Sequence, residues 1–345
     1  MDIKQTIKYQ ILKSKKDMRL DIFLNKVLFN ENGYYYDQKP IGRKKDFLTS
    51  PEVSQLFGEI IGLYLLYFWK THINSKFNLI ELGPGNGTLF KDIVNSVKNY
   101  PDFLNNANIT FIEINKYLTK KQKESFKNLN LSNTNWKSKF NLKSNYPSII
   151  YSNEFFDCFP VRQFFLNEIW YEKFVSFNKI ENYFFFKDKI VSEKKMLSLL
   201  DLYKKEKLLE ISFERNRYYK DICNHIRDKG GLFLTVDYGY FKNINSFSLQ
   251  AIRNHKFSNV LEFLGKQDIS SHVNFLDLKS IAEKNKLNIE EMCTQRDFLI
   301  KYGILERQEN LLKLNNKIKL DGELDRLINT NNMGDLFKFL VVSNL

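Results

Sequence analysis

The sequence contains few of the residues that build cross-linked or metal-stabilised proteins. Its 345 residues include only three cysteines and four histidines. Cys158, Cys223 and Cys293 are far apart and odd in number, so the sequence predicts neither a disulfide framework nor a C-x-x-C metal site. The histidines show no H-E-x-x-H or comparable spacing, and we expect no structural metal. The cysteine usage indicates a reducing compartment.

Long apolar runs are also lacking. The most apolar stretch, residues 60–69, is too short to span a bilayer and follows Glu59, so we expect a buried helix there. The first residues contain no apolar leader core. Asp2, with no arginine before Arg19, is unlike a mitochondrial presequence. The sequence therefore predicts a cytoplasmic protein without a membrane span.

Arginine is scarce among the basic residues. The net charge is +13, but 43 lysines accompany only 10 arginines, and they are spread over the whole length. Because arginine supplies the bidentate fork that binds phosphate and guanine, lysine-rich basicity is weak evidence for nucleic-acid binding. We therefore do not expect a nucleic-acid partner. Apolar residues make up 43% and charged residues 27%, which is ordinary for a folded globular protein.

Glycine is sparse as well, yet Gly83, Gly85 and Gly87 alternate within the segment LIELGPGNGT. An apolar run that ends in an acid and enters a glycine loop is typical of a strand, a tight loop and a helix, with a cofactor against the bare backbone. A dinucleotide fingerprint has the spacing G-x-G-x-x-G. The form E-x-G-x-G-x-G is instead seen where S-adenosylmethionine (SAM) methyltransferases begin. The pattern predicts that the glycines and Thr88 hold SAM, with Glu81 facing its ammonium group; a turn that binds nothing is the alternative.

The chain after this loop alternates strands and helices. Apolar runs predict strands at 78–82, 109–114 and 148–153, and amphipathic spacing predicts helices at about 87–98 and 116–127. We therefore expect an α/β fold with a parallel sheet, helices on both faces and ligands beyond the carboxyl ends of the strands.

A second acid closes a predicted strand. Glu113 lies 26 residues after Gly87, where a methyltransferase sheet places the acid that accepts hydrogen bonds from the ribose hydroxyls. The alternative is a solvated Glu at a strand end.

The remaining segments flank this core. Residues 1–30 show helical spacing, and a second helix is expected to begin near residue 50 with Ser50 as its N-cap. Aromatic runs at 163–190 predict an inserted antiparallel hairpin that packs against the domain; stacking on nucleobases is the alternative. Later elements are a helix at 213–229, a strand at 232–237, loop and helix at 240–285, strands at 289–294 and 337–342, and helices within 296–328.

Four parts follow from this order. They are a helical N-terminal lid segment (1–76), a SAM-binding core (77–162 with 210–240), an inserted aromatic-rich hairpin (163–209), and a substrate-side region with the last strands (241–345).

Several segments together resemble the MidA-like family of SAM-dependent methyltransferases. The most specific is SNEFFDCFPVR at 152–162, after the strand at 148–153. The others, in order between residues 18 and 342, are GYY at 33–35, Gly42, DFLTSPEVSQLFGE at 46–59, the glycine loop, VDYGY at 236–240, LQAIRNH at 249–255, SHVNF at 271–275, Gln295 with Phe298-Leu299, and MGDLFK at 333–338. Phe213 stands where the family has Pro, and Asn86 where many members have Arg, but no glycine or acid of the motifs is lost.

The resemblance implies a Rossmann-like class I methyltransferase sheet with SAM as its cofactor. The family includes the mitochondrial complex I assembly factor that acts as a protein arginine methyltransferase. An arginine-containing protein, in particular a subunit of respiratory complex I, is then the expected partner.

Within the strongest motif, Glu154 and Asp157 lie three residues apart just past a strand end. With the resemblance, this spacing predicts that they accept the N–H donors of an acceptor guanidinium, and Asn153 is expected beside the cofactor. The alternative is that Asn153 and Glu154 only tie the loop together.

Other candidates lie farther along the chain. His255 and His272 are in polar, loop-like surroundings where either could relay the released proton, with a structural role as the alternative. Residues 46–59 are expected to form a lid over SAM, with Ser54 and Gln55 facing inward. Two other classes stay open: a SAM-binding assembly protein without turnover, and a methyltransferase for RNA or a small molecule.

Overall fold

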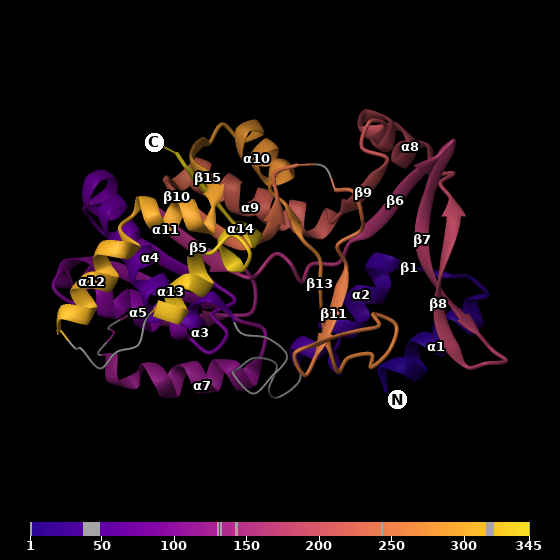
Figure 1. Cartoon of the computed structure of the whole chain (residues 1–345), viewed down its shortest axis with the longest axis horizontal. Helices are drawn as coiled ribbons and strands as arrows, with labels where there is room; N and C mark the ends of the chain where they lie inside the picture. The colour runs from indigo at the N-terminus through magenta and orange to yellow at the C-terminus, as the bar shows by residue number, and fades with distance from the viewer. Residues whose placement is uncertain are drawn as a thin grey trace.

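The computed structural model describes residues 2–36, 49–129, 131, 133–141, 144–242, 244–314 and 321–344. Figure 1 shows two groups of elements side by side. One group surrounds a large sheet with helices on both faces. The other contains two smaller sheets and the first two helices.

The large sheet has the strand order β15-β16-β10-β5-β2-β3-β4, and β14 pairs with β10. Its strands are β2 (Phe77–Leu82), β3 (Ala107–Ile112), β4 (Thr134–Lys137), β5 (Ser148–Asn153), β10 (Gly231–Tyr240), β14 (Val273–Asn274), β15 (Asn288–Thr294) and β16 (Phe337–Ser343). Pairing is parallel from β10 to β4, whereas β16 runs antiparallel to both β10 and β15. The expected α/β fold with a parallel sheet is confirmed. The antiparallel strand is β16, which lies between β15 and β10.

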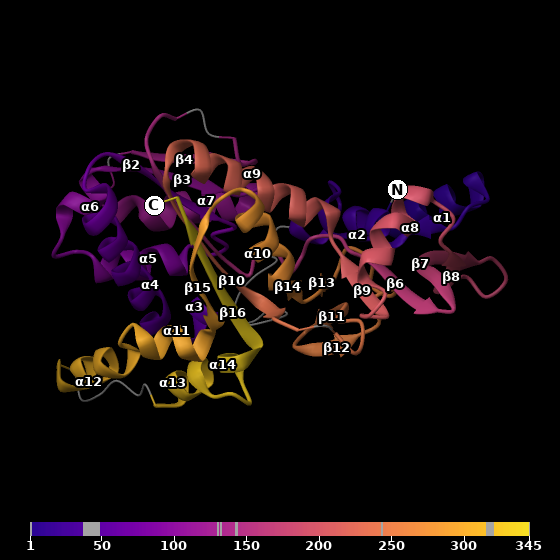
Figure 2. The same cartoon turned by 90° about the horizontal axis from the view of Figure 1, so that it is seen from above.

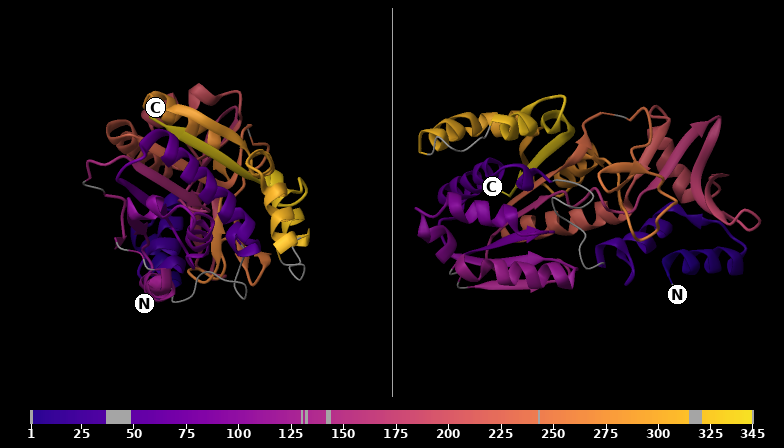
Figure 3. Two further views of the ribbon diagram at one scale, coloured as in Figure 1. Left: turned by 90° about the vertical axis from the view of Figure 1, so that its left-hand side faces the viewer. Right: turned by 60° about the horizontal axis from the view of Figure 1, so that its bottom comes forward.

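Side chains of the central strands alternate between two cores. On β2, Leu79 packs with one core and Ile80 with the other, and both are buried. The first core includes α3 (Ser50–Val53), α4 (Gln55–Phe68), α5 (Thr88–Ser96), α6 (Pro101–Asn105), α7 (Lys116–Phe126), α11 (Gln295–Lys301), α12 (Ile304–Leu314), α13 (Asp321–Ile328) and α14 (Met333–Leu336). The second core is covered by α9 (Phe213–Lys229) and α10 (Phe275–Lys284). Figure 2 shows α11 to α14 together near α3 and α4, and in Figure 3 these yellow C-terminal helices lie along one side of the sheet.

The aromatic segment forms more than a hairpin. A five-stranded antiparallel sheet joins β1 (Met18–Arg19), β6 (Arg162–Asn167), β7 (Ile169–Asn178), β8 (Tyr183–Ile190) and β9 (Leu208–Ile211). A three-stranded sheet joins β11 (Gln250–Arg253), β12 (Lys256–Ser258) and β13 (Asp268–Ser270). Val175 and Phe177 of β7 are buried against α1 (Ile3–Ser14), α2 (Leu20–Phe29) and β13. Buried aromatic side chains of this segment lie in two further cores, Phe177 and Phe184 in one and Phe164 and Trp170 in the other, so the predicted hairpin is part of a larger sheet.

Short elements complete the described chain. They are α8 (Lys194–Leu200), the 3₁₀ turns Tyr34–Tyr36, Lys127–Leu129 and Asp201–Tyr203, and the π turn Trp69–Ile73. No helix of the described residues is long and apolar enough to cross a membrane.

Helix starts differ from expectation at one place. Ser50 is the first residue of α3 rather than its N-cap, and Thr49 takes the cap position in an extended conformation. Helix α3 ends before Ser54, whose backbone is also extended. The Ser54 hydroxyl accepts a hydrogen bond from Leu56 N at the start of α4. The helix predicted to begin near residue 50 is therefore four residues long, and α4 contains most of the buried helix predicted at 60–69.

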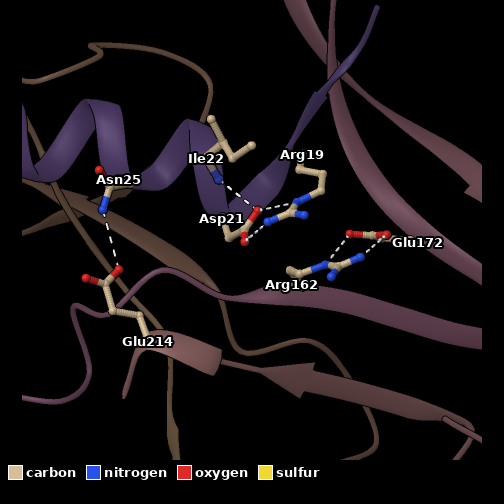
Figure 4. A network of polar contacts seen from close by, with 7 residues as sticks. All are labelled: Arg19, Asp21, Ile22, Asn25, Arg162, Glu172 and Glu214. Carbon is tan, nitrogen blue, oxygen red and sulfur yellow. Dashed lines mark hydrogen bonds and ion pairs between the residues drawn. The ribbon is translucent and has the colours of Figure 1, made fainter. Parts of the chain in front are cut away.

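A polar network holds the second group of elements together (Figure 4). Arg162 of β6 forms two hydrogen bonds of 2.6 Å with Glu172 of β7, and both side chains are buried. Asn25 of α2 lies 3.5 Å from Glu214 of α9, which links this group to the helix that covers the large sheet. Arg162, the last residue of the family motif at 152–162, therefore forms an ion pair within the five-stranded sheet.

Candidate functional site

A hollow opens where the carboxyl ends of β2 and β5 meet. Fourteen residues line it: Tyr35, Thr49, Pro51, Glu52, Glu81, Gly83, Pro84, Gly85, Asn86, Thr88, Leu89, Asn153, Glu154 and Asp157. They come from the glycine loop, the loop after β5, α3 and the segment after α2. The structure thus brings together most of the residues that the sequence predicted as a site.

The glycine loop has a backbone that other residues rarely adopt. The φ angles of Gly83, Gly85 and Gly87 are +63°, +54° and +76°. A Cβ on Gly83 would lie 2.8 Å from the ring of Phe155, and one on Gly87 would lie 2.5 Å from the ring of Phe126. Only glycine fits these positions without movement, and the bare backbone leaves room for a ligand.

Glu81 is a buried carboxylate at the end of β2. Only 3% of the residue is exposed, and the Tyr151 hydroxyl donates a hydrogen bond of 3.2 Å to its Oε2. Burial raises the pKa of Glu81 to about 8. A ligand ammonium group would favour the charged form and offset this burial.

Glu113 follows β3 directly, and burial raises its pKa to about 7. Its oxygens accept hydrogen bonds from Asn115 N at 2.8 Å and from Gln122 Nε2 at 3.3 Å. The same Gln122 amide donates to the Gly85 carbonyl at 2.7 Å. Glu113 is outside the fourteen lining residues, but Gln122 connects it to the glycine loop.

The loop after β5 carries the second group of acids. Glu154 has a φ of +51°, and its Oε1 accepts hydrogen bonds from Ser50 N at 3.3 Å and Asn153 Nδ2 at 3.0 Å. The Glu154 Oε2 and the Asn153 Oδ1 are buried without a hydrogen-bond partner among the described residues. Burial raises the pKa of Glu154 to about 8 and that of Asp157 to about 6. Asn153 and Glu154 both line the hollow, so the N–H groups of a ligand bound there are candidate partners for these two oxygens.

Charge in the hollow opposes that of the whole chain. Glu52, Glu81, Glu154 and Asp157 are four of the described lining residues, and none of the others is Lys, Arg or His. In a chain with a net charge of +13, this concentration of acid favours a cationic ligand. The buried acceptors, the acids and the glycine backbone fit SAM, which carries an ammonium group, a sulfonium and ribose hydroxyls.

Several predicted residues are placed differently. Thr88 lines the hollow, but its hydroxyl donates to Glu52 Oε1 at 2.8 Å. Gln55 is exposed, contrary to the expectation that it faces inward, because Ser54 ends one helix and caps the next. Asp46, Phe47 and Leu48 of the predicted lid, and Gly42, lie outside the described residues.

The two histidines are also separated from each other. His255 is exposed in the turn between β11 and β12, and both Asn254 and His255 have positive φ. Neither His255 nor His272 is among the described residues that line the hollow, so the role of proton relay stays a prediction for both. His272 is half-buried with its ring stacked on Tyr238, and burial lowers its pKa.

Sequence reasoning did not assign roles to several residues near the site. Tyr35 and Glu52 line the hollow, Gln122 supports the glycine loop, and Asp237 accepts hydrogen bonds from the loop after β5. Tyr35, Glu52 and Asp237 all lie in segments that resemble the family, and this resemblance was the feature of the sequence that could have pointed to them. Gln122 had none, because a polar residue on a charged helix is ordinarily solvated.

Comparison with known proteins agrees with this geometry. Residues 60–293 match the model of a family described as "Putative S-adenosyl-L-methionine-dependent methyltransferase". The chain is 30% identical over 333 residues to the protein named protein arginine methyltransferase NDUFAF7 homolog, mitochondrial, of Caenorhabditis elegans, covering 88% of this chain and 76% of the relative. It is 28% identical over 379 residues to the human protein arginine methyltransferase NDUFAF7, covering 96% and 81%.

A solved structure has the same fold. A protein of Burkholderia thailandensis, crystallised with S-adenosyl-homocysteine bound, superposes with a TM-score of 0.85. The alignment covers 99% of this chain and 92% of that one at 19% identity.

The comparisons correct one expectation. The relatives from Caenorhabditis elegans, zebrafish and human are all named as mitochondrial proteins. The names of these relatives contradict the prediction of a cytoplasmic protein, which was drawn from composition and from the first residues and is wrong.

Proposed function

The chain belongs to the family of S-adenosylmethionine-dependent methyltransferases, and we propose that it transfers the methyl group of SAM to an arginine side chain of a protein. The relatives named as protein arginine methyltransferases support this acceptor. The observation that carries the proposal is the buried, unpartnered Oε2 of Glu154 in an acid-lined hollow.

On the donor side, the residues of β2 and β3 would hold SAM. Glu81 would accept hydrogen bonds from the ammonium group, and Glu113 would accept hydrogen bonds from the ribose hydroxyls. The backbone of Gly83 and Gly85 would lie against the methionine part. SAM supplies an electrophilic methyl group on a sulfonium, which is transferred by in-line displacement. The protein's main contribution is then to hold donor and acceptor in attack geometry, worth up to about 7 to 11 kcal/mol of the barrier.

On the acceptor side, Glu154 and Asp157 would orient the guanidinium. Arginine presents five N–H donors in a planar fork, and carboxylate oxygens accept them in charge-assisted hydrogen bonds. The cation would favour the ionised form of Glu154, whose pKa burial has raised to about 8. An ionised Glu154 can then take the proton that the methylated guanidinium releases near neutral pH. His255 and His272 stay the candidates for passing that proton on; neither is among the described residues that line the hollow, and burial lowers the pKa of His272.

The acid lining argues against phosphate-bearing acceptors. Among the described lining residues four are acidic and none is Lys, Arg or His, so the hollow offers no cation to bind the phosphates of RNA or DNA. A cationic side chain of a protein meets the opposite sign of charge. This supports a protein acceptor over a nucleic acid.

Substitutions at the acceptor loop test the proposal. Glu154→Gln and Asp157→Asn keep the shape of each side chain and remove its charge, so we expect methyl transfer to fall by about 100-fold or more. The dissociation constant for SAM should stay within about threefold, because neither residue is assigned to the donor. Exposed Glu124 on α7 gives a matched control, since Glu124→Gln should leave both quantities unchanged. Equal loss of SAM binding would assign the two acids to the cofactor or the fold.

A finer proposal concerns the acceptor itself. We propose a subunit of respiratory complex I, on the strength of the family resemblance. Incubating purified complex I with the protein and labelled SAM would test it: label on one subunit is the expected result, and an unlabelled complex beside a labelled protein of another kind would contradict it.

A further inference from the structure

The end of β10 holds the loop that carries Glu154 and Asp157. Asp237 is fully buried, and its Oδ2 accepts hydrogen bonds from Phe155 N at 3.1 Å and from Phe156 N at 2.7 Å. The preceding Val236 carbonyl accepts from Glu154 N at 2.9 Å. Three consecutive amides of the loop are therefore bound by two adjacent residues of β10.

The loop needs this support because its conformation is unfavourable by itself. The φ of Glu154 is +51°, and a left-handed residue other than glycine costs on the order of 1 kcal/mol or more. Such a conformation persists only where surrounding contacts fix it. Without Asp237, two buried amides would also lack acceptors.

The fixed loop is coupled to the glycine loop. Phe155 lies so close to Gly83 that a Cβ there would be 2.8 Å from its ring. Ser271 N donates to the Asp157 carbonyl at 2.9 Å from the other side. A shift of the loop would therefore move the acceptor acids relative to the donor site.

We propose that Asp237 is a positioning residue for methyl transfer, which acts by binding the amides of Phe155 and Phe156. It is not among the residues that line the hollow, so it acts through Glu154 and Asp157 rather than by touching a ligand. The inference rests on the proposed function. A displacement of about 1 Å at a reacting group can cost about 100-fold in rate.

Two substitutions separate the hydrogen bonds from the charge. Asp237→Ala removes the acceptor, so kcat should fall about 100-fold while the dissociation constant for SAM stays within about threefold. Asp237→Asn keeps one oxygen for both loop amides, loses the charge, and gives up only the hydrogen bond of 2.9 Å that Oδ1 accepts from Tyr238 N, so kcat should stay within about tenfold of wild type. If the Ala variant does not fold, Asp237→Ser takes its place, since its hydroxyl is too short to reach both amides.

Amide hydrogen exchange measures how firmly the loop after β5 is held, and it needs no acceptor protein. In the full-length protein, the amides of residues 154–158 should exchange at least about tenfold faster in Asp237→Ala than in wild type or Asp237→Asn, whereas those of β2 should be unchanged. Unchanged exchange at the loop would overturn this inference alone. An Asn variant as inactive as the Ala variant would overturn it too, because the charge would then be the active property. A wild-type protein that binds SAM but transfers no methyl group would overturn the proposed function and this inference together.

Discussion

At the scale of single residues, backbone conformation and buried charge define the site. Gly83 and Glu81 show the two effects most clearly, since one has a φ of +63° and the other is 3% exposed. Both lie at the donor end, next to the hollow. Their substitution therefore tests SAM binding separately from the acceptor.

Gly83→Ala should weaken SAM binding by about fivefold or more. The new Cβ must take an unfavourable φ and displace the ring of Phe155, at a cost of about 1 to 3 kcal/mol, and about 1.4 kcal/mol corresponds to tenfold. Isothermal titration with SAM measures the effect. Gly322→Ala is the control, because Gly322 of α13 is exposed with no atom within 4 Å of its added Cβ. Equal affinities for both variants would show that the glycine loop is not a binding surface.

Glu81 should make the stability of the ligand-free protein depend on pH. Burial raises its pKa from 4.5 to about 8, so between these values the folded state keeps a proton that the unfolded state has lost. The stabilisation is present below pH 4.5 and is lost as the pH rises through about 8. Urea unfolding at pH 6 and pH 7 should show the free energy of unfolding falling by up to about 1.4 kcal/mol more in wild type than in Glu81→Gln. An equal fall in both proteins would mean that Glu81 is already ionised.

At the scale of helices and strands, the sequence predicted elements with strong local signals. Helix α9 was placed at its observed residues, because Ser212 caps its first turn and Gly230 follows its last. Strands β2 and β5 were found because both are apolar runs buried on both faces. Strand β4 was missed because its residues are mostly polar and alternately exposed. Strand β1 was missed because two residues are too few to show an alternation of apolar and polar side chains.

The five-stranded sheet contains a buried ion pair between Arg162 of β6 and Glu172 of β7. Arg162→Ala would leave Glu172 charged and buried beside β6, so we expect a loss of about 3 to 5 kcal/mol in the free energy of unfolding. Arg19→Ala is the control shown in the same view, since the Arg19–Asp21 pair is far more exposed and should contribute about 1 kcal/mol or less (Figure 4). Chemical denaturation measures both. A combined Arg162→Met and Glu172→Leu variant should regain most of the lost stability, and a variant as unstable as the single one would contradict this account.

At the scale of the whole molecule, the hollow is built by parts that are distant in the sequence. Glu81 and Glu154 of the hollow, and Glu113 outside it, were predicted because each lies at or just after the end of an apolar strand, and the carboxyl ends of parallel strands meet at one edge. Tyr35 and Asp237 were not assigned, since their roles depend on contacts across the fold: the Tyr35 hydroxyl donates to Asp268 of β13, and Asp237 binds the neighbouring loop. The turn between β11 and β12 was not predicted, because Asn254 and His255 form it without the glycine that is usual in a tight hairpin turn.

Tyr35, which follows α2 of the second group of elements, lines the hollow together with residues of the group around the large sheet. The central claim is that the methyl group of SAM ends on an arginine of a protein. The most direct measurement is to incubate the wild-type protein with methyl-labelled SAM and cell extract, digest the labelled protein, and locate the label by mass spectrometry. We predict a nuclease-resistant label on an arginine side chain, which is absent when Glu154→Gln replaces the wild type. Label on RNA, on a small molecule or on another side chain, or SAM binding without any transfer, would contradict it.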